Sequence, residues 1–321
     1  MIHPIPPGTR DVLPDEMREL RVIAARLREL FEGAGYGEVR TPALEYEDVL
    51  RRGDERAASA PFRLFDDQGR VLVLRSDMTI PIARLVASRY ADAEPPLRFC
   101  YFQHAYRAPE RARTSTEFLQ GGIELIGSPG AAGEVEVLAL TAESLTAVGL
   151  RRHRIGLGDG GLYRTLLAEL EVPEEGRPPL LALLTERRYV ELEAQIERLG
   201  LPPSARDLLV ELPRVRGGPE VLERGAGPAA AAVEGLRELH AGLEEWGIAD
   251  RVIFDLGLVR ELDYYTGAVF DVYDPAVGFA LGGGGRYDGL LARFGRDLPA
   301  CGLALDLQAV HTAQAEEDRL G

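Results

Sequence analysis

Polar side chains that could hold a small molecule are concentrated in L-V-R-E-L-D-Y-Y-T-G-A-V-F-D, residues 258–271. The segment carries the guanidinium of Arg260, the carboxylate of Asp263 and the phenol of Tyr265. Its remaining residues alternate like those of a buried strand, and a buried strand holds charged groups only where each group finds a hydrogen-bonding partner. The segment therefore predicts a binding site for a polar ligand.

Further segments carry polar side chains of the same kinds. Asp77 and Thr79 lie in L-R-S-D-M-T, and Arg107 ends Y-F-Q-H-A-Y-R. Gln120 and Glu124 lie four residues apart in F-L-Q-G-G-I-E-L, which places both on one face of a strand. Each residue alone is more often structural than functional. Together, acids, an amide, arginines and phenols match a zwitterionic amino acid with a polar side chain.

Two glycine-rich segments have more than one interpretation. In L-G-G-G-G-R-Y-D-G-L, residues 281–290, glycines allow the backbone to approach a ligand or another strand closely, just before Arg286 and Tyr287. The alternative is a flexible hairpin with polar surface residues. G-L-G-D-G-G at 156–161 matches a dinucleotide-binding pattern, but no strand with an acidic end follows at the required distance. We interpret the second match as chance.

The composition excludes several classes of protein. The 321 residues suffice for one large or two ordinary domains, and 45% hydrophobic with 28% charged residues is an ordinary globular balance. All 37 basic residues are arginine, which excludes P-loop, Schiff-base and pyridoxal chemistry that depends on lysine. The net charge of −15 argues against nucleic acid as a partner of the surface as a whole.

The sequence contains no pattern typical of a metal, cofactor or membrane protein. The five histidines lack metal-ligand spacing, and Cys100 and Cys301 form neither a disulfide framework nor a CxxC pair. No apolar run approaches the roughly 18–20 residues of a membrane span. The N-terminus has no export signal. We expect no cofactor, no membrane association and a cytoplasmic location.

The elements that must position the polar residues follow from hydrophobic periodicity. Helices are predicted at 14–32, from about Pro81 to Arg89, and at about 132–148. Strands are predicted at 36–45, where Pro42 stops the strand, and at 97–106, 117–126, 252–256, 267–273 and 300–305, with a hairpin at 62–75.

Residues 166–247 differ from the rest because they show no strand pattern and are rich in Ala, Leu, Glu and Arg. Runs of strands interrupted by such a block predict an α+β fold. We expect a core domain formed by 1–165 and 248–321, with a helical insertion at 166–247.

Over nearly its whole length, the sequence resembles the catalytic domain of class II histidyl-tRNA synthetases. The matching motifs are P-P-G-T-R-D-V-L-P, Y-G-E-V-R-T-P, L-R-S-D-M-T, the strand–loop–strand region 97–127, L-V-R-E-L-D-Y-Y-T-G and G-G-R-Y-D-G-L. Within class II, the last two are specific to the histidine enzymes. The resemblance implies an antiparallel sheet flanked by helices, and a homodimer formed through the first class II motif around Pro42.

The resemblance also implies a histidine pocket. Asp77, Thr79 and Gln120 would take the α-ammonium group, although the synthetases usually have glutamate at the position of Asp77. Glu124 and Tyr265 would contact the imidazole, one accepting and one able to donate, as its two unlike nitrogens require.

The carboxylate end of the ligand is assigned in the same way. By resemblance, Arg107 and Arg260 would face the carboxylate of histidine, and Tyr287 would close the pocket. Each charge of a bound histidine would then have a hydrogen-bonded counterpart, as a buried ion requires.

Departures from the synthetase pattern bear on the function. Synthetases end the core with a motif of the form G-L-E-R, whose arginine lies against the adenine of ATP, whereas this chain has D-L-Q-A at 306–309. An arginine–adenine stack is worth roughly 0.5–2 kcal/mol, and the carboxylate of Asp306 would oppose ATP. Only eleven residues follow Val310, where synthetases carry an anticodon-binding domain. Glu261 also replaces a glycine, and the loop after Arg107 is one residue shorter.

A retained pocket without the adenylation motif or the tRNA reader resembles the regulatory subunits of ATP phosphoribosyltransferase. L-R-S-D-M-T-I-P-I-A-R is also closer to that family. This resemblance implies a chain without catalytic activity that activates a short catalytic subunit in a hetero-oligomer, relays histidine inhibition of histidine biosynthesis and binds no tRNA. Two alternatives stay open: a truncated synthetase-like enzyme that activates histidine with ATP, and a histidine sensor for another partner.

Overall fold

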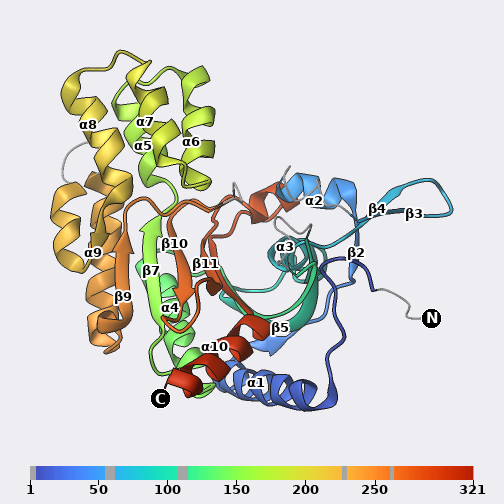
Figure 1. The fold of residues 1–321 in the computed structure, drawn as a ribbon. Coiled ribbons are helices and arrows are strands. Elements are labelled where there is room, and N and C mark those ends of the chain that lie inside the picture. Colours follow the sequence, from blue (N-terminus) through green and yellow to red (C-terminus); the bar gives the residue numbers. More distant parts are fainter. Residues whose placement is uncertain (1–4, 55–61, 108–114, 226–229, 261–263, 321) are drawn as a thin grey trace.

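The computed structural model describes residues 5–54, 62–107, 115–225, 230–260 and 264–320. A nine-stranded sheet runs through the molecule in the order β1-β5-β6-β12-β11-β10-β7-β9-β8 (Figure 1). Its strands are β1 Gly37–Glu38, β5 Leu97–Tyr106, β6 Glu117–Ile126, β7 Arg154–Asp159, β8 Arg216–Gly217, β9 Val252–Asp255, β10 Ala268–Tyr273, β11 Ala280–Arg286 and β12 Ala300–Asp306. All pairs are antiparallel except β1 with β5 and β7 with β9. The predicted α+β class with a largely antiparallel sheet is confirmed.

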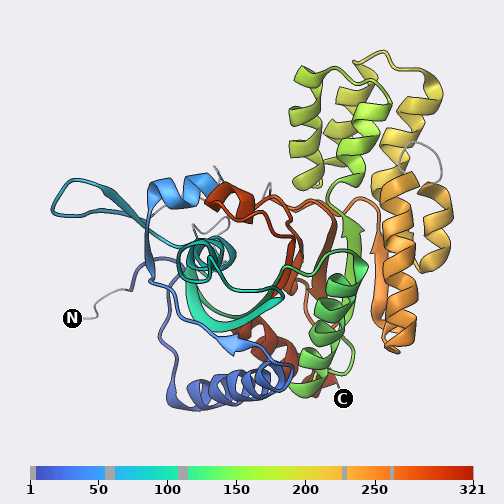
Figure 2. The same cartoon turned by 180° about the vertical axis from the view of Figure 1, so that it is seen from behind.

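Helices cover the sheet on both faces and extend beyond one end of it. They are α1 Pro14–Gly33, α2 Glu47–Gly53, α3 Thr79–Arg89, α4 Ala131–Ala147, α5 Leu162–Glu169, α6 Arg177–Thr185, α7 Tyr189–Glu197, α8 Pro203–Glu211, α9 Ala230–Glu245 and α10 Leu307–Leu320, with short 3-10 helices at Glu174–Gly176, Leu212–Arg214, Pro219–Gly225, Ala249–Arg251 and Leu291–Phe294. Helices α1, α4 and α10 pack on one face, and α3 lies on the other (Figures 1 and 2). Helices α5 to α8 form a group beyond the ends of β7 and β10 (Figure 1).

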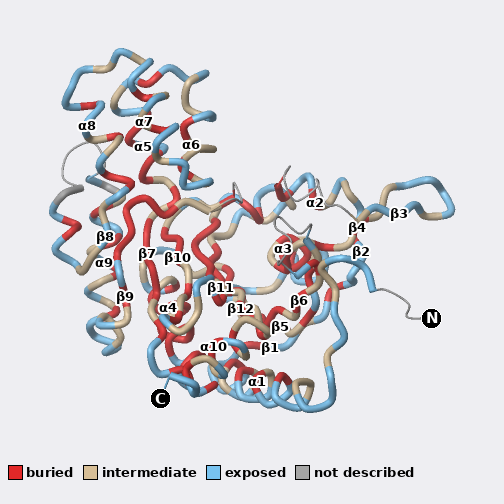
Figure 3. The backbone as a smooth tube through the Cα atoms, viewed as in Figure 1, coloured by how far each residue is buried: buried red, intermediate tan, exposed pale blue. Residues whose placement is uncertain are grey.

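Two hydrophobic cores lie on the two faces of the sheet. Cys100 and Ile123 point into the larger core, which α1, α4 and α10 cover. Phe99 and Tyr101 point into the smaller core, which α3 covers. Neighbouring residues of β5 enter different cores because side chains alternate along a strand. Buried residues accordingly follow the strands and the inner faces of the helices (Figure 3).

Helix α1 confirms the helical periodicity of its sequence. Its buried residues Leu20, Ile23, Leu27 and Phe31 recur every three or four positions and form one stripe. Complete burial of one such side chain contributes about 1.5–3 kcal/mol. The helix ends before Gly35, whose φ of 86° suits a residue without a side chain.

The segment 36–45, predicted as a strand stopped by Pro42, contains two short strands that belong to different sheets. Strand β1 joins the large sheet, whereas the following β2 (Leu44–Tyr46) belongs to a second sheet with β4 (Val71–Leu74) and β3 (Arg63–Phe65). Pro42 between them has no N–H to offer a strand partner. The buried Arg75 donates through Nη1 to the carbonyl oxygens of Thr41 and Pro42, both at 2.8 Å, so a side chain replaces the strand ladder there. The hairpin predicted at 62–75 is confirmed by the pairing of β3 with β4.

Several element boundaries also differ from those predicted. Helix α3 begins at Thr79 rather than near Pro81 because the Asp77 carboxylate accepts a hydrogen bond from the backbone of Ile80. The block 166–247, predicted to lack strands, contains the two-residue strand β8 at the edge of the large sheet. The division into a core domain and an insertion stays a prediction. No helix of the described ranges is long and apolar enough to cross a membrane.

Candidate functional site

A hydrogen-bonded group of three predicted site residues lies between α3 and the large sheet. Glu124 on β6 is only 1% exposed. Thr79, the first residue of α3, donates its hydroxyl to Glu124 Oε1 at 2.8 Å. The hydroxyl of Tyr287, which directly follows β11, donates to Glu124 Oε2. Residues far apart in the sequence therefore share one buried carboxyl group.

The space for this carboxyl group comes from a glycine on the neighbouring strand. Gly302 of β12 lies opposite Glu124 in the strand register. A Cβ at Gly302 would lie 2.0 Å from Glu124 Oε2, far inside van der Waals contact. Glycine is therefore required at this position for Glu124 to keep its place. Sequence reasoning missed Gly302 because strand pairing is needed to recognise its neighbour.

Burial dominates the electrostatics of Glu124. Removal from water raises the pKa of its carboxyl group to about 8, and the nearby Asp77 adds to this, while the donors Tyr287 and Thr79 oppose it. The group is therefore mostly protonated at neutral pH in the unliganded protein. A cationic or N–H-bearing ligand beside it would favour the ionised form.

Asp77 and Arg107 lie next to this group. The buried Asp77 accepts from the backbone N–H of Ile80 at 3.0 Å. Burial raises the pKa of Asp77, and the Arg107 guanidinium is one of the groups that oppose the rise. Arg107 is exposed, and its Nε donates to the carbonyl oxygen of Ser76 at 3.0 Å. The guanidinium thus lies at the rim of the site rather than inside it.

Three tyrosine rings form a wall of the site. The ring centroids of Tyr264 and Tyr265 are 4.8 Å apart, and those of Tyr265 and Tyr287 are 6.5 Å apart. Tyr264 is buried between them, 5.7 Å from Tyr287. Sequence reasoning missed Tyr264, because strand-like alternation would send neighbouring residues to opposite faces. The strand-like interpretation is wrong for residues 264–267, which connect to β10 through a turn and a bend.

Arg260 lies beside Tyr265. Its Nη1 donates to the carbonyl oxygen of Phe270 at 2.9 Å and to Asp271 Oδ1 at 2.6 Å. Its Cζ lies 5.7 Å from the centroid of the Tyr265 ring. Arg260 is therefore held by β10 while its guanidinium contacts the tyrosine wall.

The glycine run of β11 makes room for both side chains. A Cβ at Gly283 would lie 2.2 Å from Arg260 Nη1, and one at Gly285 would lie 3.0 Å from the ring of Tyr265. The run pairs with β10 and β12 on its two sides. The close-approach interpretation of this segment is confirmed; β11 does form a hairpin with β10, but Arg286 and Tyr287 are buried rather than on the surface.

Gln120 and Asp306 face each other where β6 pairs with β12. Gln120 is 7% exposed, and among the described residues its Oε1 has no hydrogen-bond partner. Asp306 Oδ1 accepts from the backbone N–H groups of Gln308 at 2.9 Å and Ala309 at 3.1 Å, which caps α10. The residue that departs from the synthetase motif is therefore a helix cap. Ala309 offers no guanidinium at the position of the motif arginine.

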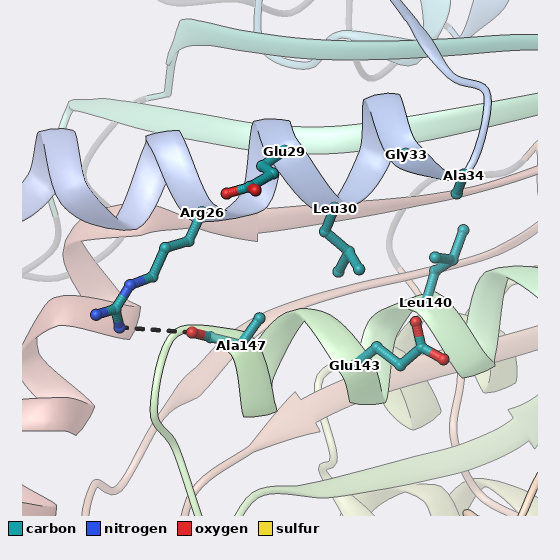
Figure 4. Close-up of a pocket in the computed structure, with 8 residues that line it drawn as sticks. All are labelled: Arg26, Glu29, Leu30, Gly33, Ala34, Leu140, Glu143 and Ala147. Atoms are coloured by element: carbon teal, nitrogen blue, oxygen red, sulfur yellow. Dashed lines mark hydrogen bonds between the residues drawn. The ribbon is translucent and has the colours of Figure 1, made fainter.

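Other sequence features lie outside this site. Glu261, Asp263 and the loop 108–114 fall outside the described residues. In the described part of the chain, no group of three or more His, Cys, Asp or Glu residues could hold a metal ion. A groove of 620 Å³ between α1 and α4 contains none of the predicted site residues; there Leu30 faces Leu140, and Arg26 Nη1 donates to the carbonyl oxygen of Ala147 (Figure 4).

Comparison with known proteins places this geometry in a family. A family model described as histidyl-tRNA synthetase matches residues 8–310. A curated relative from Desulforamulus reducens, named ATP phosphoribosyltransferase regulatory subunit, is 40% identical over 314 residues, which cover 96% of this chain and 78% of the relative. The chain belongs to the ATP phosphoribosyltransferase regulatory subunit family. The resemblance inferred from the motifs is confirmed.

Solved structures agree with this membership. One from Bacillus halodurans, described as an ATP phosphoribosyltransferase regulatory subunit/histidyl-tRNA synthetase, has a TM-score of 0.90 at 34% identity and covers 98% of this chain and 83% of its own. Another, described as a histidine–tRNA ligase subunit from Alicyclobacillus acidocaldarius, has a TM-score of 0.84 at 34% identity and covers 99% of both chains. The class II synthetase-like fold is thereby confirmed.

The family assignment also bears on catalysis. The relatives are named as regulatory subunits, so this member of the ATP phosphoribosyltransferase regulatory subunit family is a regulatory chain and not itself the enzyme. The alternative of a truncated synthetase-like enzyme is not favoured.

Proposed function

We propose that this chain activates a short catalytic subunit of ATP phosphoribosyltransferase and binds free histidine around Glu124 as a feedback signal. The observation that carries the proposal is a buried polar cluster around Glu124 combined with a replaced adenine-binding motif. Thr79 and Tyr287 still hold the buried carboxyl group of Glu124. At the third motif, Asp306 is used to cap a helix.

The α-ammonium group of histidine would lie beside Asp77, Thr79 and Gln120. The Oε1 atom of Gln120 supports this assignment, because it is a buried acceptor without a partner among the described residues. An unpaired buried acceptor costs about 1–3 kcal/mol, and an ammonium donor would remove that cost. Asp77, which lies near Glu124, would supply the opposite charge.

The rest of the ligand would lie along the tyrosine wall. Glu124 would accept from one imidazole nitrogen, and the Tyr265 hydroxyl would donate to the other. Arg107 and Arg260 would face the carboxylate, and Tyr287 would close the pocket beside Glu124. Arginine suits this role because its planar fork matches the two oxygens of a carboxylate.

Regulation requires that histidine bind two states of the complex with different affinities. We propose that the chain forms a homodimer within a cytoplasmic hetero-oligomer with the catalytic subunit and binds no tRNA. Histidine would then act from a distance, by favouring the less active state of the complex.

Co-purification with a short catalytic subunit, followed by an activity assay, tests the proposal. We expect a stable complex, activation of the catalytic subunit, and inhibition by histidine that is lost in the complex made with Glu124→Gln. The exposed Glu197→Gln on α7 is the matched control and should be inhibited normally. Failure to form a complex, or normal inhibition of the Glu124→Gln complex, would refute the proposal.

A second assay separates the proposal from the synthetase-like alternative. The purified chain should give no histidine-dependent exchange of pyrophosphate into ATP. Robust exchange would show that the chain activates histidine with ATP instead of binding it as a signal.

A further inference from the structure

Arg286, which directly precedes Tyr287, is a buried arginine to which the proposed histidine site assigns no role. Its side chain is 7% exposed, and its Nε lies 3.0 Å from Glu134 Oε2. Nη1 donates to Asp288 Oδ1 at 2.9 Å, and Nη2 donates to the carbonyl oxygen of Gly130 at 2.6 Å. A guanidinium group with three fixed partners has a single orientation, because its donors form a planar fork.

The partners of Arg286 include a well-packed helix. Glu134 lies in the first turn of α4, which has 17 residues, and Gly130 directly precedes this helix. Helix α4 packs on α1, α9 and β12. An acidic side chain in the first turn of a helix is itself stabilised by the helix dipole. Residues on packed helices are placed more precisely than residues on loops, so α4 fixes the position of Arg286.

The same network holds the turn before β10, which carries two rings of the tyrosine wall. Glu134 Oε1 accepts from the backbone N–H of Ala268 at 3.2 Å, where the turn meets β10. The backbone N–H of Thr266 donates to the carbonyl oxygen of Arg286 at 2.9 Å. The hydroxyl of Thr266 accepts from the backbone N–H of Asp288 at 3.0 Å. The turn is therefore fastened both to α4 and to the end of β11.

Tyr287, the third ring of the wall, is fastened by the residues on either side of it. Its backbone N–H donates to the carbonyl oxygen of Ala300 at 2.7 Å, and Asp288 Oδ1 accepts from the backbone N–H of Ala300 at 3.1 Å. The Tyr287 hydroxyl donates to Glu124 Oε2. The position of this hydroxyl therefore depends on how Arg286 and Asp288 are held.

We propose that Arg286, held by Glu134, is a positioning residue of the histidine site. It sets the place of the turn and of the Tyr287 hydroxyl before the ligand binds, and it acts through them instead of contacting the ligand. Contacts that are ordered in advance bind more tightly, because the ligand does not have to order them. This inference rests on the proposed function, since histidine is the ligand whose contacts are positioned.

Calorimetric titration of histidine into the full chain tests this role, with Glu134→Gln as the main variant. Glutamine keeps the size of the side chain and an acceptor for Ala268, but it removes the charge that holds Arg286. We expect histidine to bind about tenfold more weakly, the effect of losing one charge-assisted hydrogen bond to the ligand.

Glu136→Gln is the matched control on the same helix. Arg98 donates to the two oxygens of Glu136 through Nε and Nη2, both at 2.9 Å, so that ion pair is of the same kind but joins α4 to β5. Its loss should leave the histidine affinity unchanged. Circular dichroism gives the folded fraction of each variant, because a chain that is nine-tenths folded loses only about a tenth of its apparent affinity through unfolding.

A double-mutant cycle separates positioning from a general loosening of the fold. Tyr287→Phe removes the hydroxyl that Arg286 is proposed to place, so Glu134→Gln should weaken histidine binding less in that background than in the wild-type chain. Thr266→Ala is a milder variant on an exposed residue and decides the matter if Glu134→Gln does not fold. We expect it to weaken histidine binding about threefold.

The outcomes distinguish this inference from the proposed function. Wild-type histidine affinity in both Glu134→Gln and Thr266→Ala would overturn the positioning role and leave the proposed function standing. Fully additive effects of Glu134→Gln and Tyr287→Phe would also overturn it. If the wild-type chain binds no histidine, alone or with the catalytic subunit, the proposed function fails and the positioning role fails with it.

Discussion

Glu124 is the residue on which the site depends, and its protonation links the pocket to the stability of the fold. Its carboxyl group has a pKa of about 8 because it is buried. An exposed glutamate in an unfolded chain has a pKa of about 4.3. A group whose pKa is raised on folding binds its proton more tightly in the folded state. Its stabilising contribution is therefore complete below pH 4.3 and is lost as the pH rises through about 8.

This linkage predicts a pH-dependent free energy of unfolding. Between about pH 5 and pH 8, Glu124 alone should lower stability by up to about 1.4 kcal/mol for each pH unit. The Glu124→Gln variant should show a shallower dependence, because glutamine does not titrate. Urea unfolding at a series of pH values measures both slopes, and identical slopes would contradict the raised pKa.

A second residue-scale prediction concerns the glycine opposite Glu124. Gly302→Ala should lower the free energy of unfolding by about 1–3 kcal/mol, since the added methyl group overpacks against the carboxyl group. The same variant should lose histidine binding, because Glu124 must move. Gly289→Ala is the control: a Cβ there meets no atom within 4 Å. Equal effects of the two substitutions in denaturant titrations would argue against the close contact.

At the scale of elements, Asp306 determines where the last helix begins. Asp306→Ala should destabilise the protein by about 0.5–2 kcal/mol, because two backbone N–H groups of α10 lose their acceptor. Asp306→Asn should retain most of the stability, since burial raises the pKa of Asp306 and a neutral side chain avoids that cost. Chemical denaturation of both variants measures the difference. Equal losses would show that charge, rather than capping, is what α10 needs.

The sequence predicts helices and strands well where a hydrophobic pattern extends over many residues. It predicts them poorly where side-chain hydrogen bonds replace the pairing of backbone groups. Strands β5 and β6 match the predicted ranges 97–106 and 117–126, because ten residues of apolar pattern leave little ambiguity. The break between β1 and β2 depends on Arg75, which is distant in sequence. Strand β11 contains four glycines, whose low strand propensity conceals its place in the sheet.

The site residues also fall into two groups: those that a local sequence pattern predicts and those that only the tertiary structure reveals. Glu124 and Tyr287 could be selected from their motifs, because the motifs carry unusual polar residues. Tyr264 and Gly302 could not, since their roles arise from a turn and from the register of two paired strands. A local sequence pattern identifies the polar residues proposed to bind the ligand. Strand pairing and turns identify the residues that give those side chains their space.

At the scale of the whole molecule, the larger core depends on the position of the C-terminal helix. Glu317 of α10 is buried and accepts from the backbone N–H groups of Arg151 and Arg152 at 3.1 and 2.8 Å. These contacts tie the end of the chain to the segment between α4 and β7. Helix α10 in turn packs on α1, β6 and β12, which form one wall of the larger core.

Removing the hydrogen bonds of Glu317 should lower the free energy of unfolding of the whole protein. Glu317→Ala should lower the free energy of unfolding by about 1–3 kcal/mol, because the partly buried backbone donors of Arg151 and Arg152 lose their acceptor. Asp318→Ala, on the exposed neighbouring residue, should change it by less than about 0.5 kcal/mol. Thermal and urea unfolding of both variants provide the measurement. A similar effect of both substitutions would assign the stabilisation to surface charge.

The cap formed by Asp306 has an evolutionary consequence. A variant of this chain with the motif G-L-E-R would have glycine at Asp306, glutamate at Gln308 and arginine at Ala309, and the first of these changes would remove the acceptor of two helix donors. An intermediate in which Asp306 alone is replaced would be less stable before it gained any affinity for ATP. The requirement of α10 for its cap therefore opposes replacement of Asp306 by glycine, and with it a return of the adenine-binding motif.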